Sequence, residues 1–160
     1  MKFLRVSEKS FLVLLTLANL GLRFFRLNNP NLPYFDEKAF YLPAAREILS
    51  SGFDPLFEHP PLSKIFFALS IHIFGDNSLG WRFFPIVFSV LSVLIVYFLA
   101  KKLFNDRKIA SIAAILFSLD FAWFTSSRLA FPEVVFASLF LLSCYFLVCF
   151  LKEKTRDQKG

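Results

Sequence analysis

The run FFPIVFSVLSVLIVYFLA, residues 83–100, decides the fold because it is apolar, uncharged and long enough to cross a bilayer. A hydrocarbon core of about 30 Å takes about 20 helical residues at a rise of about 1.5 Å each. Two further runs fit the same description with one acid each: residues 109–127 contain only Asp120, and residues 129–151 contain only Glu133. The three runs predict spanning helices, the first extending over about 83–103.

A fourth span is predicted near the N-terminus, over about residues 10–27. Residues 10–22 carry no charge, and the long side chains of Arg23 and Arg26 can reach the membrane surface from the end of the run. A cleaved signal peptide is the alternative, but no small-residue cleavage pattern precedes residues 28–33. We therefore expect a retained helix.

The overall composition excludes a disordered chain and disfavours a soluble domain. Hydrophobic residues make up 56% of the 160 residues and Phe occurs 24 times, whereas soluble domains contain roughly 45–50% apolar residues. The net charge of +6 in such an apolar chain indicates membrane topology rather than nucleic-acid binding. Two cysteines within one apolar run, Cys144 and Cys149, form neither a disulfide framework nor a zinc site.

The basic residues predict which ends face the cytosol. Eleven of the 18 lie in residues 1–9, 101–108 and 152–160. With four spans, all three clusters fall on one side, as the positive-inside rule requires. The apolar piece 62–74 is too short to span and contains Lys64 and His72, so we interpret it as interfacial; if it crossed, the cluster at 101–108 would face outward. The chain is thus expected to be integral to a prokaryotic plasma membrane, with both termini cytoplasmic.

The segment 28–82 then forms an extracytoplasmic loop with two juxtamembrane helices. Asp36 is a suitable N-cap for a helix over about 36–50, and Pro43 should kink or divide that helix. A second helix is predicted over about 61–74, because proline is favoured in the first turn. The expected fold is an all-α polytopic membrane protein, with residues 1–160 forming one membrane domain.

The start of the second juxtamembrane helix has the chemistry of an anion site. Pro60 holds His59 extended, so Glu58 and His59 are presented just before the helix N-terminus. Lys64 in the first turn opposes the helix dipole, and a cation beside free helix N–H groups suits a phosphate. A snorkelling role for Lys64 is the alternative, and Glu58 with His59 alone would be an incomplete metal site.

A third polar group is predicted where the last two spans meet. Glu133 lies about one and a half turns beyond Arg128, and a carboxylate at membrane depth costs at least about 2.5 kcal/mol, so it needs a partner or a hydrated cavity. Arg128 is the nearest candidate. The two could also be a structural pair, just as Asp36 could be a plain helix cap.

Four elements in this order resemble one enzyme family along about 130 residues: the acids DE at 36–37, HPPLSK at 59–64, GWR at 80–82 and SR at 127–128. The pattern is similar to the protein O-mannosyltransferases and lipid A aminoarabinose transferases of the C-type membrane glycosyltransferase superfamily. In those enzymes the sugar donor is a polyprenyl phosphate and the active site faces away from the cytosol.

The resemblance implies a role for each matching residue. Asp36 would be the general base with Glu37 beside it, and Glu58 and His59 would lie near the acceptor or a divalent cation. Three cations would hold the donor phosphate: Lys64, Arg82 and Arg128. A base for the acceptor hydroxyl and cations for the leaving phosphate imply single displacement with inversion. The family usually has Leu-Asp after Ser-Arg where this chain has Pro132-Glu133, so the role of Glu133 stays open.

Family members are several hundred residues long. We therefore expect this chain to be an N-terminal part or short form that acts with a second membrane polypeptide or as a homo-oligomer. Its expected ligands are a lipid-linked sugar and membrane lipids, not nucleic acid, and metal dependence is unknown. One alternative function is a non-catalytic subunit that binds lipid phosphate or assembles a larger glycosyltransferase; another is a membrane scaffold without a ligand.

Overall fold

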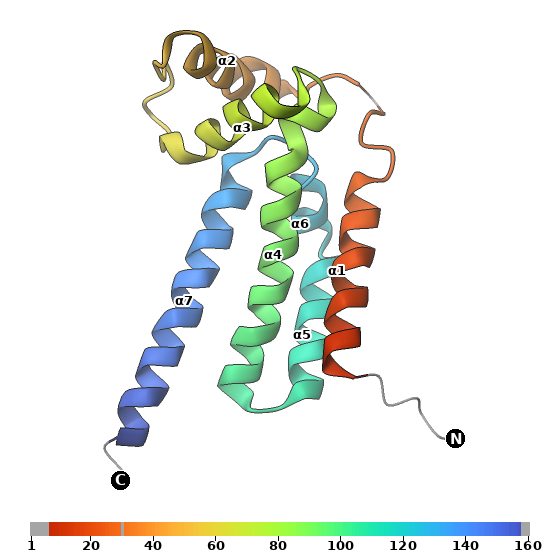
Figure 1. Cartoon of the computed structure of the whole chain (residues 1–160), viewed down its shortest axis with the longest axis vertical. Helices are drawn as coiled ribbons and strands as arrows, with labels where there is room; N and C mark the ends of the chain where they lie inside the picture. The colour runs from red at the N-terminus through yellow and green to blue at the C-terminus, as the bar shows by residue number, and fades with distance from the viewer. Residues whose placement is uncertain (1–6, 30, 158–160) are drawn as a thin grey trace.

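The long helical segments stand side by side, and shorter helices lie across one end of them (Figure 1). This computed structural model describes residues 7–29 and 31–157, which are helical or irregular and contain no strands. The elements are α1 (Glu8–Phe24), η1 (Glu37–Tyr41), α2 (Leu42–Ser51), α3 (Pro61–Phe74), α4 (Ser78–Phe104), α5 (Arg107–Leu119), α6 (Phe121–Ser126) and α7 (Pro132–Asp157). The expected all-α architecture is confirmed for this part of the chain.

Two of the four expected spans have the full length and apolar character of spanning helices. These are Ser78–Phe104 and Pro132–Thr155. The helix α4 packs against both α5 and α7, and Ser92 on α4 bonds to Ser138 on α7 at 2.7 Å between their hydroxyl oxygens. The helices α1 and α5 are shorter, with 17 and 13 residues, so a fourfold crossing stays a prediction.

The third predicted span, 109–127, is two helices rather than one. Asp120 ends α5 with an extended ψ of 124° and caps α6, its carboxylate accepting from the Trp123 N–H at 2.7 Å. An aspartate competes for backbone N–H groups in this way, which favours a helix start over a helix interior. The span predicted over 129–151 also starts later than predicted, at Pro132.

The side chain of Arg23 in α1 points inward, contrary to the snorkelling predicted for it. It is fully buried and donates to the Ser127 hydroxyl at 3.0 Å and to the Asn19 side chain at 2.5 Å. The α1 helix is thereby joined to the turn between α6 and α7. A buried cation therefore lies beside the turn between α6 and α7.

The first juxtamembrane helix is divided near Pro43, as predicted, but Asp36 does not cap it. Asp36 has helical dihedral angles and makes no side-chain capping bond. The chain forms the π-helix η1 before Pro43 enters the first turn of α2. Because the first turn of a helix needs no N–H from this residue, proline is well tolerated there, whereas farther inside a helix it removes a hydrogen bond. The α2 helix ends at Ser51, and Gly52 (φ 73°) caps it.

Gly80 allows α3 and α4 to approach each other closely. A β-carbon built at this position would lie 1.9 Å from the carbonyl oxygen of Gly75, so no other residue fits without moving the backbone. This contact sets the turn that places Trp81 and Arg82 under α2 and α3. The core there consists of Tyr41, Leu42, Ala45, Phe67, Ala68, Ile71, Trp81 and Ala130.

The start of α1, the α4–α5 turn and the end of α7 share the end of the bundle opposite to α2 and α3 (Figure 1). The described members of the three basic clusters therefore gather at one end, as the four-span prediction requires. Lys2, Arg5 and Lys159 lie outside the described residues. Which end faces the cytosol stays a prediction.

Candidate functional site

Glu37 is the centre of a buried polar cluster at the end of the bundle that carries α2 and α3. Its side chain is fully buried and forms an ion pair with Arg82, with distances of 2.9 and 3.1 Å between the guanidinium nitrogens and the two carboxylate oxygens. The same carboxylate accepts from the backbone N–H groups of Tyr34 at 2.5 Å and Ala130 at 2.6 Å. It therefore ties η1 to α4 and to the segment before α7.

Arg82 completes this cluster by donating to the chain that follows α1. Its guanidinium bonds to the carbonyl oxygens of Leu27 at 3.2 Å and Leu32 at 3.0 Å. Buried charges need partners of this kind, because the free energy of hydration that a buried ion loses must be compensated by ion pairs and hydrogen bonds. Glu37 and Arg82 thus hold the loop in place. Asp36, the other acid of the predicted catalytic pair, takes no part in these bonds.

A cavity of about 420 Å³ opens beside this cluster and contains two guanidinium groups. Arg82 and Arg128 both line it, together with Phe124 and apolar or amide residues of the 27–34 segment. Arg128 donates to the carbonyl of Phe25 at 2.8 Å and stands over the Phe124 ring at 5.8 Å. Burial lowers the pKa of Arg128, and the charge of Arg82 lowers it further. An anion in this cavity would offset both effects.

Arg23 adds a third cation at the same aromatic ring. Its guanidinium lies 5.2 Å from the centroid of Phe124, and no ion pair with a carboxylate is found for it among the described residues. In the same part of the chain, its buried Nη2 has no hydrogen-bond partner. Because leaving a buried charged donor unsatisfied is costly, this arrangement favours an anionic ligand near the α6–α7 turn.

An apolar groove of about 460 Å³ runs between α1 and the α5–α6 segment and shares Phe124 with the cationic cavity. Its lining residues are Leu15, Ala18, Asn19, Leu22, Ile115, Ser118, Leu119, Phe121 and Phe124. The apolar groove therefore lies next to a cavity that is lined by cations. Such a surface suits an amphiphile with a long hydrocarbon chain and an anionic head.

Asp36 faces a smaller cavity of about 130 Å³, which Glu133 also lines. Tyr41 lies between them: burial raises the pKa of the Tyr41 hydroxyl, and the charges of Glu133 and then Asp36 raise it further. No hydrogen bond or ion pair engages the carboxylate of Asp36 among the described residues. Arg128 and Glu133 form no ion pair, so the pairing suggested for them from the sequence is wrong, and Glu133 instead faces a cavity.

Lys64 does not reach the cavity that Arg82 and Arg128 share. Its ammonium group is fully buried, forms an ion pair with Asp54 at 2.5 Å and donates to the backbone carbonyls of Leu56 and His59. These contacts close the loop between α2 and α3. In this geometry Lys64 positions the loop, and it lies apart from Arg82 and Arg128, the other two cations expected on the donor phosphate.

Replacing Lys64 by Met should lower the free energy of unfolding by about 2 kcal/mol, because two carbonyls lose a charged donor while Asp54 retains some access to water. Thermal unfolding in detergent measures this, with Lys38→Met as a control at an exposed position of η1. The folded variant should keep its affinity for an amphiphilic phosphate. A stable variant that had lost that affinity would instead place Lys64 on the phosphate.

Glu58 and His59 are not among the residues that line the Asp36 cavity. Glu58 is exposed, and the half-buried ring of His59 meets Tyr41 edge-on with centroids 5.6 Å apart. No group of three or more His, Cys, Asp or Glu side chains that would hold a metal occurs among the described residues. The roles of these two residues toward an acceptor or a divalent cation stay predictions.

Comparison with known proteins yields one family model and several relatives. The model described as dolichyl-phosphate-mannose-protein mannosyltransferase matches residues 58–158. The polyprenol-phosphate-mannose–protein mannosyltransferase of Mycolicibacterium smegmatis is 32% identical over 145 residues, which are 85% of this chain and 28% of that protein. The protein of the same name from Mycobacterium tuberculosis is 28% identical over 155 residues, which are 91% of this chain and 29% of that protein.

A second kind of relative matches a shorter segment. The undecaprenyl phosphate-alpha-4-amino-4-deoxy-L-arabinose arabinosyl transferase of Pseudomonas savastanoi is 38% identical over 61 residues, 38% of this chain and 11% of that protein. No solved structure matches the chain significantly. The chain spans less than a third of the length of the curated relatives that it matches.

Proposed function

Because the chain belongs to the dolichyl-phosphate-mannose-protein mannosyltransferase family, we propose that it binds a polyprenyl-phosphate-linked sugar and takes part in transferring that sugar to an acceptor. The relatives' names specify two different sugars on polyprenyl phosphates, mannose and aminoarabinose. The feature that they share is the lipid phosphate. The proposal therefore concerns the binding of that phosphate and its lipid chain first, and the sugar second.

The observation that carries the proposal is the cationic cavity that adjoins an apolar groove at Phe124. We assign the polyprenyl chain to the groove between α1 and α5–α6. The phosphate then lies near Arg128, with Arg82 held beside it by Glu37 and with the unpartnered Nη2 of Arg23 close to the same ring. Burial of apolar surface provides affinity here, and the guanidinium groups provide selectivity for the phosphate.

The chemistry follows from this placement. The acceptor hydroxyl oxygen attacks the anomeric carbon of the sugar while the bond from that carbon to the phosphate oxygen breaks. The hydroxyl proton passes to a carboxylate, which we assign to Asp36 because no other contact engages it, and the phosphate leaves with the bonding electrons toward Arg128. A single displacement of this kind inverts the anomeric centre. We assign the orientation of the acceptor to Glu133, which lines the same small cavity as Asp36.

The acceptor side of the site needs more residues than this cavity provides. Its volume of about 130 Å³ is well below the roughly 300 Å³ at which small-molecule sites begin. We propose that a second polypeptide or another copy of the chain completes it. In the membrane, α1, α4, α5–α6 and α7 would cross the bilayer, with the α2–α3 end outside and the basic end in the cytosol of a prokaryotic cell.

Binding of three matched ligands tests the proposal. The full chain in nanodiscs is titrated with polyprenyl-phosphate-mannose, with a polyprenol of equal length and with mannose 1-phosphate. We expect saturable binding of the first ligand alone, because it combines the anionic head with the lipid chain. Equal binding of the uncharged polyprenol would show that the cations do not select the phosphate. Equal binding of mannose 1-phosphate would show that the apolar groove does not bind the lipid chain.

A further inference from the structure

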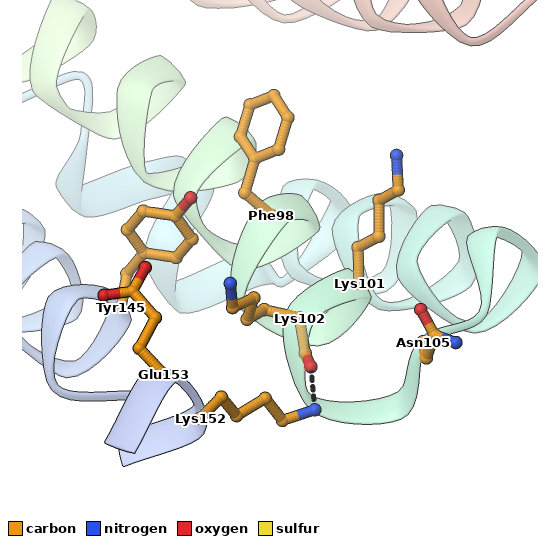
Figure 2. A pocket seen from close by; sticks show the side chains of 7 residues that line it. All are labelled: Phe98, Lys101, Lys102, Asn105, Tyr145, Lys152 and Glu153. Carbon is orange, nitrogen blue, oxygen red and sulfur yellow. Dashed lines mark hydrogen bonds between the residues drawn. The ribbon is translucent and has the colours of Figure 1, made fainter. Parts of the chain in front are cut away.

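A second polar cavity lies at the opposite end of the bundle, between the last turns of α4 and α7. Its volume is about 540 Å³. Figure 2 shows the residues that line it: Phe98, Lys101, Lys102, Asn105, Tyr145, Lys152 and Glu153. Nothing in the proposed transfer reaction uses this cavity, since the residues assigned to that reaction lie toward the other end.

Two of the three lysines already have partners. Lys101 forms an ion pair with Glu8 of α1 at 2.5 Å. Lys152 of α7 donates to the carbonyl of Lys102 in the last turn of α4 (Figure 2) and to that of Leu103. Carbonyls at a helix C-terminus carry partial negative charge, so Lys152 both satisfies them and cancels their repulsion toward an anion.

Lys102 is the cation that these contacts leave over. Its ammonium group has no hydrogen-bond or ion-pair partner among the described residues, and it extends from α4 toward Tyr145 and Glu153 of α7 (Figure 2). Glu153 is the only acid of the lining, against three lysines. The cavity therefore keeps a net positive charge, with a free ammonium group directed across it.

The position of the cavity along the helices indicates the kind of anion. The helices α4 and α7 are the two with the length and apolar character of spanning helices, and the lysines follow directly after their apolar runs. At that level a cavity opens among lipid headgroups. The rings of Phe98 and Tyr145 suit the boundary between headgroup and hydrocarbon, where aromatic side chains are enriched.

We propose that this cavity binds the headgroup of an anionic phospholipid, with its phosphate on Lys102. Basic pockets between spanning helices hold such headgroups in other membrane proteins. The lipid would bridge the ends of α4 and α7, which otherwise meet there through Lys152. The site is separate from the proposed donor site, so it stands or falls independently of the proposed function.

Native mass spectrometry of the full chain from nanodiscs of mixed phosphatidylglycerol and phosphatidylcholine tests this site. We expect retained phosphatidylglycerol, and about fivefold weaker retention in Lys102→Gln, the effect of one cation near an anionic surface. The matched control is Lys154→Gln, which removes the same charge from an exposed position of α7 outside the cavity. Neither change should alter thermal stability, because neither side chain has a hydrogen-bond or ion-pair partner within residues 7–29 and 31–157 as described.

Three results would overturn the proposal. Equal loss in Lys102→Gln and Lys154→Gln would mean a diffuse charge effect instead of a site. Equal retention of phosphatidylcholine would show that the cavity does not select anionic headgroups. Displacement of the lipid by millimolar inorganic phosphate would identify a site for free phosphate. A charge reversal, Lys102→Glu, provides a second variant that should abolish the preference altogether.

Discussion

Replacing Glu37 by Gln should lower the free energy of unfolding by about 3–5 kcal/mol, the cost of breaking a buried ion pair by removing one partner. The change keeps the shape of the side chain but leaves the guanidinium of Arg82 buried without a counter-charge. It also weakens the two backbone N–H bonds that Glu37 accepts, from Tyr34 and Ala130. Because a domain is stable by only about 5–15 kcal/mol, a loss of this size is a large fraction of the stability.

Thermal unfolding of the full chain in detergent measures the effect. Glu47→Gln is the matched control, since Glu47 is exposed on α2 and its carboxylate has no ion-pair partner among the described residues. It should unfold at the wild-type temperature. If Glu37→Gln were equally stable but inactive in transfer, Glu37 would be the proton acceptor that the sequence pattern also allows, and its structural role here would be rejected.

Replacing Asp36 by Asn should reduce sugar transfer by about 10²–10⁴-fold, the usual contribution of a positioned general base. The amide has the same shape as the carboxylate but cannot take the hydroxyl proton. Donor affinity and thermal stability should not change, because Asp36 lines the cavity that faces Glu133 and makes no bond that the fold needs. This combination of lost turnover and intact binding separates a proton acceptor from a phosphate ligand.

The assay follows transfer from polyprenyl-phosphate-mannose to an acceptor peptide by the chain reconstituted with the membranes of its host. Glu47→Gln serves as the control, because Glu47 is an exposed acid of α2 outside this cavity. Unchanged transfer in Asp36→Asn would remove the proposed base. Loss of donor binding in the same variant would also count against it.

Several elements of the fold could be predicted because single residues punctuate the sequence. The helix predicted over 61–74 is observed as Pro61–Phe74, since Pro60 and Pro61 start it and Gly75 ends it. The division near Pro43 follows from the missing N–H of proline. The helices α4 and α7 could be predicted for a different reason, because no charged residue interrupts the central turns of their apolar runs.

Contacts distant in the sequence could not be predicted in this way. Arg23 was expected at a membrane surface because its partner Ser127 is 104 residues away and its inward orientation depends on how α1 packs. The Lys64 ammonium was expected on a ligand because nothing in the local pattern shows that Asp54 folds back to it. Likewise, the partner of Glu37 is Arg82, 45 residues later, and this contact determines which residue of the acidic pair is buried.

The break at Asp120 had a local signal that the apolar pattern concealed. Aspartate is a favoured N-cap residue, and Asp120 accepts from the N–H of Trp123 three residues later. The hydrophobic residues on both sides of it, however, indicate one continuous span. For Arg82 and Arg128, the sequence was more informative. The family resemblance implies that both bind the donor phosphate, and both line one cavity in the structure, whereas Lys64 lies elsewhere.

The affinity of Arg128→Gln for polyprenyl-phosphate-mannose is the most direct test of the central claim, that the cationic cavity holds the donor phosphate. Arg26→Gln is the matched control: it removes the same group from an exposed position at the same end of the bundle, outside the cavity. We expect Arg128→Gln to bind at least about tenfold more weakly, since a charged hydrogen bond contributes about 1.5–3 kcal/mol. The control should bind as the wild type does. Equal affinity of both variants and the wild type would contradict the account.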